Sequence, residues 1–174
     1  MNLRILSILL LASTLYSCDT TPVQQQGNRK VDPLTQPLLE TNKYLRERNR
    51  EMIKAFVSRN AWDMRERPSG LWIDIQEKGS GKTIEIDDHI SYIYRSSSLD
   101  GMSFYESTKD DPKKILAGKG NIEAGLEEAL LYLKEGSIAR IILPPYLAHG
   151  NFGDGKKIPG ATILVVEIEI LTVK

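Results

Sequence analysis

The sequence predicts an α+β domain in residues 68–174, built from an antiparallel sheet and one short helix. Two observations predict this class. Apolar and polar residues alternate in several short stretches that are separated by glycine- and proline-containing turns, as half-buried antiparallel strands require. Between two of these stretches, residues 122–133 place apolar side chains at helical spacing instead. The chain has 174 residues, 41% of them hydrophobic, which is enough for one domain with a sizeable core and further segments.

The N-terminus has the pattern of a secretory signal peptide in residues 1–17. Arg4 gives it a positive start, and an apolar run over residues 5–15 leads to small residues. The single cysteine, Cys18, follows directly, and Leu15-Tyr16-Ser17-Cys18 resembles the bacterial lipoprotein box, in which the cysteine is lipidated. We therefore expect a lipid anchor on a bacterial membrane, with the domain outside the cytoplasm, in the periplasmic part of the cell envelope. The alternative is an ordinary cleaved signal with an incidental cysteine.

Two segments separate this signal from the domain. Residues 18–37 are rich in Gln, Thr and Pro and show no apolar period, which predicts a flexible tether. Residues 38–67 include an amphipathic helix, expected over residues 39–60, whose apolar positions are Tyr44, Leu45, Met52, Ile53, Phe56 and Val57. We expect this apolar stripe to pack on the domain that follows. The alternative is that it pairs with a second copy of the chain, and the oligomeric state stays open.

Charge is balanced over the whole chain but uneven along it. The 23 basic and 23 acidic residues give a formal net charge of zero, so we expect no nucleic-acid partner. Residues 29–67 hold ten basic and six acidic residues. A solvated helix face is the simpler interpretation of this excess, and attraction to anionic lipid headgroups near the anchor is the alternative.

The strands and turns of the domain follow from local patterns. Three stretches alternate as half-buried strands do: residues 71–76, 89–95 and 161–173. Residues 137–143 form a further β-rich run. Turn signals close these stretches at Gly79-Ser80-Gly81, Asp100-Gly101 and Pro144-Pro145. A loop is expected to start at Phe104 and to run through the polar residues 109–114.

The helix predicted within residues 122–133 has one apolar face, formed by Ile122, Leu126, Ala129, Leu130 and Leu133. Gly136 stands where the C-terminus of a helix favours a residue that can adopt positive φ. The pattern therefore predicts a short helix that is pressed close to a sheet, with a loop around residues 144–150 over its end.

Residues 70–174 resemble an FKBP-type peptidyl-prolyl cis-trans isomerase over their full length. The order and spacing of the matching residues carry the resemblance: Gly70-Leu71-Trp72, Gly79-Ser80-Gly81, Tyr92, Asp100-Gly101-Met102-Ser103-Phe104, Gly118, Ile122, Gly125-Leu126-Glu127-Glu128-Ala129-Leu130, Gly136, Pro145, Leu147-Ala148-His149-Gly150 and Ile158-Pro159. The resemblance implies an antiparallel half-barrel that wraps one short helix, with an apolar pocket between them. The order of signal, tether, helix and domain also resembles the lipoprotein isomerases associated with bacterial gliding motility.

The resemblance also implies the residues of the pocket. The catalytic positions of the family correspond to Tyr92, Phe104, Ile122 and His149 in this sequence. The substrate-binding positions correspond to Tyr105, Leu126, Ile158 and Val166. Several positions depart from the family pattern: Tyr105 for an acidic residue, Lys113 and Val166 for aromatic residues, Leu126 for an often aromatic floor, Glu123 for an apolar residue, and His149 for a hydrogen-bonding tyrosine. An imidazole N–H could donate the same hydrogen bond. From spacing alone, Tyr92 and Phe104 are better explained as core aromatics.

The implied function is a membrane-anchored prolyl isomerase that acts on proline-containing polypeptides and assists the folding of exported proteins. Such a catalyst binds the twisted amide better than either planar form, so it needs no nucleophile, and we expect no metal and no cofactor. The alternative is a catalytically weak module of the same fold, serving as a chaperone or as part of an envelope assembly such as a motility apparatus. The departures in the pocket favour the alternative, and Tyr92, Phe104 and Ile122 favour the enzyme.

Overall fold

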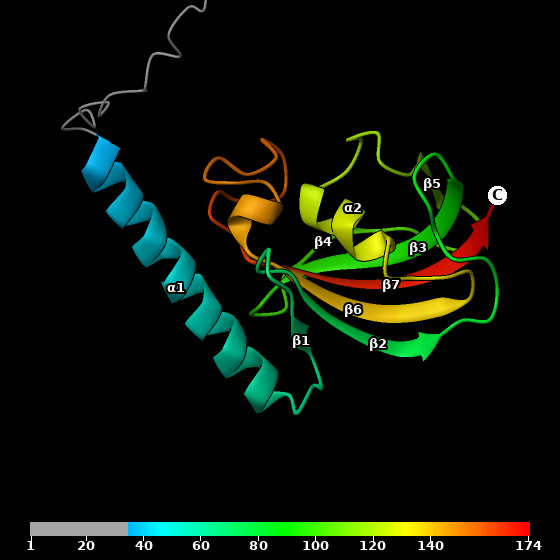
Figure 1. Ribbon diagram of the computed structural model, residues 1–174, viewed down its shortest axis with the longest axis horizontal. Coiled ribbons are helices and arrows are strands. Elements are labelled where there is room, and N and C mark those ends of the chain that lie inside the picture. The colour runs from blue at the N-terminus through cyan, green and yellow to red at the C-terminus, as the bar shows by residue number, and fades with distance from the viewer. Residues whose placement is uncertain (1–34) are drawn as a thin grey trace, which may run out of the picture. The chain divides into compact units, whose positions relative to one another are not determined.

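The computed structural model describes residues 35–174, and Figure 1 shows their arrangement. In chain order the elements are α1 (Thr35–Arg59), β1 (Arg65–Glu66), β2 (Trp72–Lys78), β3 (His89–Ser98), β4 (Ser103–Glu106), β5 (Lys113–Leu116), α2 (Ala124–Leu130), β6 (Ser137–Leu143), the 3-10 turn η1 (Pro145–Leu147) and β7 (Leu164–Val173). Residues 38–174 form one compact unit. The signal, Cys18 and all but the end of the tether lie outside the described residues. The predicted α+β class is confirmed.

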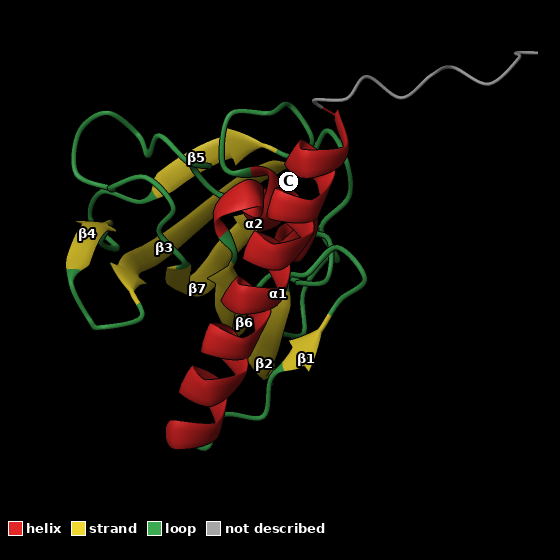
Figure 2. Cartoon of the chain, turned by 90° about the vertical axis from the view of Figure 1, so that its left-hand side faces the viewer, coloured by secondary structure: helices red, strands yellow, loops and turns green. Residues whose placement is uncertain are grey.

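All strands of the described region join one antiparallel sheet, in the order β1-β2-β6-β7-β3-β4, with β5 also paired to β3. The longest pairing joins β3 to β7, from Ile90 opposite Val173 to Ser98 opposite Leu164. Along β7 the burial alternates as the sequence predicts, because Val166 and Ile168 are buried while Glu167 is exposed. The sheet curves around α2, as Figures 1 and 2 show, which confirms the half-barrel that the resemblance implied.

The main core lies between α2 and the concave face of the sheet. Leu126, Ala129 and Leu130 of α2 are at most 2% exposed and belong to this core. The helix approaches the sheet so closely that a Cβ at Gly125 would lie 2.6 Å from Leu143 Cδ2. A glycine is therefore required at this contact, because any side chain would push α2 away from β6.

Two local predictions were wrong in detail. The helix was expected within residues 122–133, but it ends at Leu130, because the next residues bond to the segment before β3: Ile84 N–H donates to Leu133 O, and Glu135 N–H donates to Lys82 O. Gly136 has the expected positive φ of 83°, but it serves the turn into β6 rather than the end of the helix. The loop expected from Phe104 through residue 114 is confined to residues 107–112, between β4 and β5, since pairing with β3 satisfies the backbone of the residues on either side.

The helix expected over residues 39–60 is α1, and its C-terminal half packs on its own domain. Ile53 is 1% exposed and joins Trp72, Ile142, Ile163 and Val165 in a second core, with Phe56 and Val57 packed against it. Ile142 and Val165 are strand neighbours of Ile141 and Val166, which belong to the main core, so α1 covers the opposite face of the sheet.

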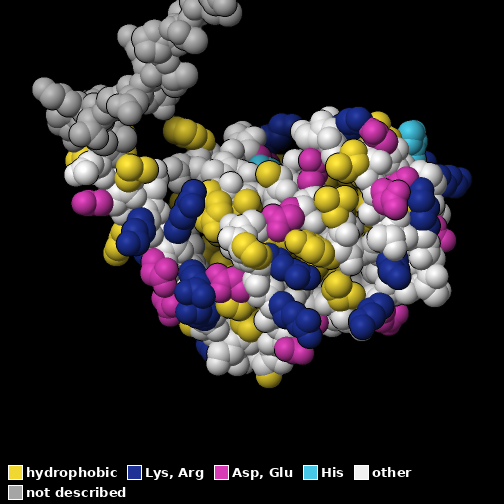
Figure 3. Space-filling view, viewed as in Figure 1, with side chains coloured by type: hydrophobic (Ala, Val, Ile, Leu, Met, Phe, Trp, Pro, Cys, Tyr) yellow, Lys and Arg dark blue, Asp and Glu magenta, His cyan; other side chains and the backbone are white. Residues whose placement is uncertain are grey.

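The outer surface of α1 carries charges of both signs. Figure 3 shows basic and acidic side chains beside one another along the helix. Two ion pairs within the helix, Arg50–Glu47 and Lys54–Glu51, balance part of its positive charge. Within residues 35–174, no helix is long and apolar enough to cross a membrane.

Candidate functional site

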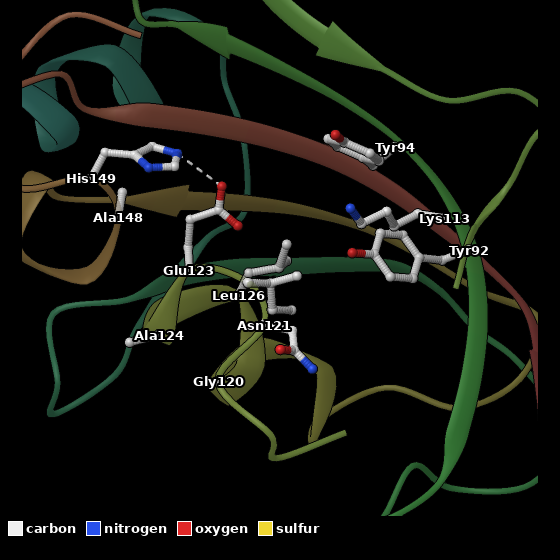
Figure 4. Close-up of a pocket in the computed structure, with 11 residues that line it drawn as sticks. Tyr92, Tyr94, Lys113, Gly120, Asn121, Glu123, Ala124, Leu126, Ala148 and His149 are labelled. Atoms are coloured by element: carbon white, nitrogen blue, oxygen red, sulfur yellow. Dashed lines mark ion pairs between the residues drawn. The ribbon is translucent and has the colours of Figure 1, made fainter. Parts of the chain in front are cut away.

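A cavity of about 370 Å³ opens between the concave face of the sheet and the N-terminal end of α2. Five parts of the chain line it: β3, the start of β5, the segment that leads into α2, α2 itself, and the loop after η1. The lining residues are Tyr92, Tyr94, Lys113, Gly120, Asn121, Ile122, Glu123, Ala124, Leu126, Ala148 and His149. Figure 4 shows ten of these side chains or Cα positions labelled around the opening.

The structure brings half of the site residues inferred from the sequence to this cavity. Tyr92, Ile122, Leu126 and His149 line it. Phe104, Ile158 and Val166 are buried in the main core and do not line it, so they can support the cavity only from behind. Tyr105 also lies away from the lining, packed against the core and bonded to a neighbouring loop. The functional roles of all eight stay predictions.

Tyr92 and Tyr94 form the wall that β3 contributes. Alternate residues of a strand face the same side of the sheet, so both rings point to the concave face, 5.8 Å apart between centroids. Figure 4 shows the Tyr92 hydroxyl directed into the cavity. Burial raises the pKa of both phenols, and the negative charge of Glu123 raises these pKa values further. Both hydroxyls therefore stay protonated and can donate a hydrogen bond to a ligand.

Glu123 and His149 both line the cavity and are in contact with each other. His149 Nε2 lies 2.9 Å from Glu123 Oε1, and Figure 4 marks this contact. The contact is electrostatic rather than a well-aligned hydrogen bond, because Nε2 has no partner with hydrogen-bond geometry. Glu123 occupies the N-cap position of α2, but its side chain does not cap the helix. The carboxylate lies at the positive end of the helix dipole, and its contact with His149 adds to this interaction.

Asp154 organises the loop between η1 and β7, which no sequence pattern revealed. Its Oδ1 accepts hydrogen bonds from the N–H groups of Lys156 and Ile158, at 2.9 and 2.8 Å. The Tyr105 hydroxyl donates to Oδ2 at 2.5 Å and, with the backbone N–H donors, holds the pKa of this carboxyl well below its usual range. Tyr105, expected to bind substrate, thus fixes the loop on which buried Ile158 lies.

Three charged or aromatic lining residues were not among the inferred site residues. Tyr94 could have been included, since it shares a face with Tyr92 at a spacing of two. Lys113 and Glu123 were recognised only as departures from a family pattern. Their position at the opening depends on β5 pairing with β3 and on the start of α2, and no local pattern reveals either.

A curved antiparallel sheet that wraps one short helix, with an aromatic wall and a cavity between them, defines a small binding domain of the half-barrel class. The chain belongs to the family of FKBP-type peptidyl-prolyl cis-trans isomerases, whose model matches residues 80–171. The resemblance of residues 70–174 to FKBP-type isomerases is confirmed, and so is the half-barrel fold that it implied.

Named relatives agree with this assignment. The chain is 34% identical over 112 residues to the FKBP-type peptidyl-prolyl cis-trans isomerase FkpA of Buchnera aphidicola, covering 64% of this chain and 44% of that protein. It is 30% identical over 107 residues to FK506-binding protein 1A of Neurospora crassa, covering 60% of this chain and 89% of that protein.

A solved structure supports the fold over a longer stretch. The crystal structure of FkpA from Escherichia coli superposes with a TM-score of 0.65 at 25% identity, covering 80% of this chain and 64% of that chain. The chain therefore spans less than two thirds of the length of either FkpA protein.

Proposed function

We propose that this protein catalyses cis-trans isomerisation of Xaa-Pro bonds in polypeptides. The observation that carries the proposal is the cavity beside Tyr92 and Leu126, in a domain that belongs to an isomerase family. Rotation about a peptide bond costs about 18–20 kcal/mol because twisting breaks amide resonance. An Xaa-Pro bond exchanges its isomers in tens to hundreds of seconds without a catalyst. A site accelerates this exchange if it binds the twisted amide better than either planar form.

The cavity offers the parts that this selectivity needs. Tyr92, Ile122 and Leu126 present apolar surface to a proline ring and exclude the water that stabilises the planar amide. The Tyr92 hydroxyl can donate a hydrogen bond to the amide carbonyl, and so can an imidazole N–H of His149. These groups act by binding and orientation, so the step requires no covalent intermediate.

The proposal is tested by NMR exchange spectroscopy on a short Ala-Xaa-Pro-Phe peptide with a catalytic amount of the full chain. This measurement keeps weak activity visible because it needs no coupled protease. Faster exchange between the two isomers supports the enzyme. A folded sample that leaves the exchange rate unchanged contradicts it.

The second candidate function is a binding module with weak catalysis, such as a chaperone. The contact between Glu123 and His149 favours such a binding module, because a proline ring that enters the cavity must displace or desolvate these polar groups. Binding of an FKBP-directed macrolide separates the two functions. An accessible apolar pocket takes up such a ligand, and a pocket closed by the contact between Glu123 and His149 does not.

We further propose that the domain is held in the cell envelope by lipidation of Cys18 and assists the folding of exported proteins. Residues 1–18 support this proposal by their pattern alone, and a role in an envelope assembly such as a motility apparatus is the alternative. Substitution Cys18→Ser should release the protein from membrane fractions. Retention of the variant in the membrane would overturn the anchor.

A further inference from the structure

The η1 turn connects the candidate site to α1 through one side chain, Tyr146. Tyr146 lies two residues before Ala148, which lines the cavity, but its ring is directed toward α1. The guanidinium carbon of Arg46 lies 4.8 Å from the centroid of this ring, a cation–π contact. Figure 1 shows η1 between α1 and α2. The loop that carries His149 is therefore in contact with a helix that covers the other face of the sheet.

The hydroxyl of Tyr146 continues this connection into the segment before β2. It donates a hydrogen bond to the carbonyl oxygen of Ser69, at 3.1 Å. A Cβ at Gly70 would lie 1.9 Å from the same hydroxyl oxygen, and Gly70 has a φ of 94°. Only glycine meets both requirements, because the φ is unfavourable for other residues and the space is already filled. Glycine at position 70 thus leaves the space that the Tyr146 hydroxyl occupies.

The connection reaches α2 through the same segment. The Ser69 hydroxyl donates to Glu128 Oε1 at 2.8 Å, and Glu128 belongs to α2. Arg46, Tyr146, Ser69 and Glu128, here called the brace, therefore join three elements. Glu123 directly precedes α2 and His149 lies in the loop that follows η1, and these two groups are in contact at the cavity.

The end of the brace on α1 is itself fixed. Ile53 is buried in the second core, and Arg50, one turn after Arg46, holds Glu66 with two parallel hydrogen bonds of 2.7 and 2.8 Å. Hollows of about 210 and 200 Å³ flank Tyr146, and residues of α1 line both. Tyr146 lies between these hollows and is the residue of η1 that the cation–π contact joins to this part of α1.

We infer that α1 positions the candidate site, with Arg46 and Tyr146 as positioning residues that set the loop carrying His149 relative to α2. The inference rests on the proposed function of the cavity as the isomerase site. Neither residue lines the cavity, so neither is expected to contact the substrate. The brace lies at the surface, where Tyr146 is 40% exposed, so its loss should loosen the loop locally rather than unfold the domain.

The test uses Arg46→Gln and Tyr146→Phe in the full chain. The first removes the cation, and the second removes only the hydroxyl bonded to Ser69. Arg48→Gln is the matched control, because Arg48 is an exposed arginine of the same helix and, two positions along it, does not share a face with Arg46. Two readouts are combined: kcat and KM for the proline peptide, and hydrogen exchange of the Leu147, Ala148 and Gly150 amides, which donate to Pro144 or Pro145.

Both brace variants should raise amide exchange in this loop by about tenfold and lower kcat/KM by a similar factor, with the unfolding temperature nearly unchanged. Arg48→Gln should behave as the parent chain, and Arg46→Lys, which keeps a cation over the ring, should restore both readouts. Unchanged loop exchange in Arg46→Gln and Tyr146→Phe overturns the inference. If the parent chain shows no isomerase activity, the proposed function fails, but the exchange measurement still tests the brace.

Discussion

Replacing Phe104 by alanine tests whether the buried support of the cavity is needed for isomerisation. Phe104 lies on β4, is 5% exposed and belongs to the main core, without lining the cavity. Removing a buried phenylalanine ring typically costs about 3–5 kcal/mol. In a folded unit of this size, each kcal/mol lowers the unfolding temperature by about 3–5 °C, so we expect a decrease of about 10–25 °C. The side chain therefore contributes to the stability of the fold, and any effect on the site must be separated from this loss.

A matched control separates these two contributions. Leu133 is fully buried in the same core, but it follows α2 on the side away from the cavity opening, where its carbonyl accepts a bond from Ile84. Leu133→Ala should cost about 2–5 kcal/mol, a similar loss of stability. Only Phe104→Ala should alter the packing behind the cavity.

The assay is NMR exchange of the proline peptide at a temperature where circular dichroism shows both variants to be folded. We expect Phe104→Ala to lose at least about tenfold in activity per folded molecule, because small shifts of a pocket wall have large effects on the bound geometry. Leu133→Ala should stay within about twofold of the parent chain. Equal activity in the two variants would refute the reasoning and leave Phe104 as a core residue only.

Three further predictions concern charge in and around the cavity. Because burial raises the pKa of the Tyr92 hydroxyl, the contribution of this group to stability is present below about pH 10 and falls at higher pH. Tyr92→Phe should therefore reduce the loss of stability between about pH 9 and 11, as measured by urea unfolding. Because the pKa of Asp154 is lowered, the contribution of this carboxylate to stability is present above about pH 4 and falls in acid. Asp154→Asn should flatten this dependence of stability on pH in the same unfolding experiment. An unchanged pH profile would argue against the role assigned to Tyr105. Glu123→Gln should change stability by less than about 1 kcal/mol, since its partner His149 is also partly exposed. The same variant should strengthen macrolide binding in calorimetry, and unaltered affinity would show that the contact between Glu123 and His149 does not restrict the cavity.

The fold was largely predictable from the sequence because its elements have strong local patterns. The alternation in β7 and the apolar stripe of α1 both appear in the structure, since burial on one side imposes a period on a strand or a helix. The strands that local reasoning missed, β1, β4 and β5, are short, and they become strands only because β2 or β3 offers an edge. Similarly, residues 131–135 leave the helix because a distant segment competes for their backbone groups.

The site was predictable only in part, and the reason is distance along the chain. Tyr92, Ile122, Leu126 and His149 lie at landmarks that a family resemblance identifies, and they meet at the cavity. The bond from Tyr105 to Asp154 joins residues 49 positions apart, and the contact of Glu123 with His149 joins two separate elements. Such contacts have no local period, so they emerge only when the strands and loops are placed in space.

The two faces of the sheet have a consequence for shortened forms of the protein. Adjacent residues of β6 and β7, such as Ile142 and Val165, supply the surface that α1 covers, together with Trp72. A chain that begins at residue 68 would keep every residue lining the cavity, yet it would expose this apolar surface to water. Exposed apolar patches promote self-association. The isolated FKBP-type domain would therefore tend to aggregate, although its pocket would keep all of its lining residues.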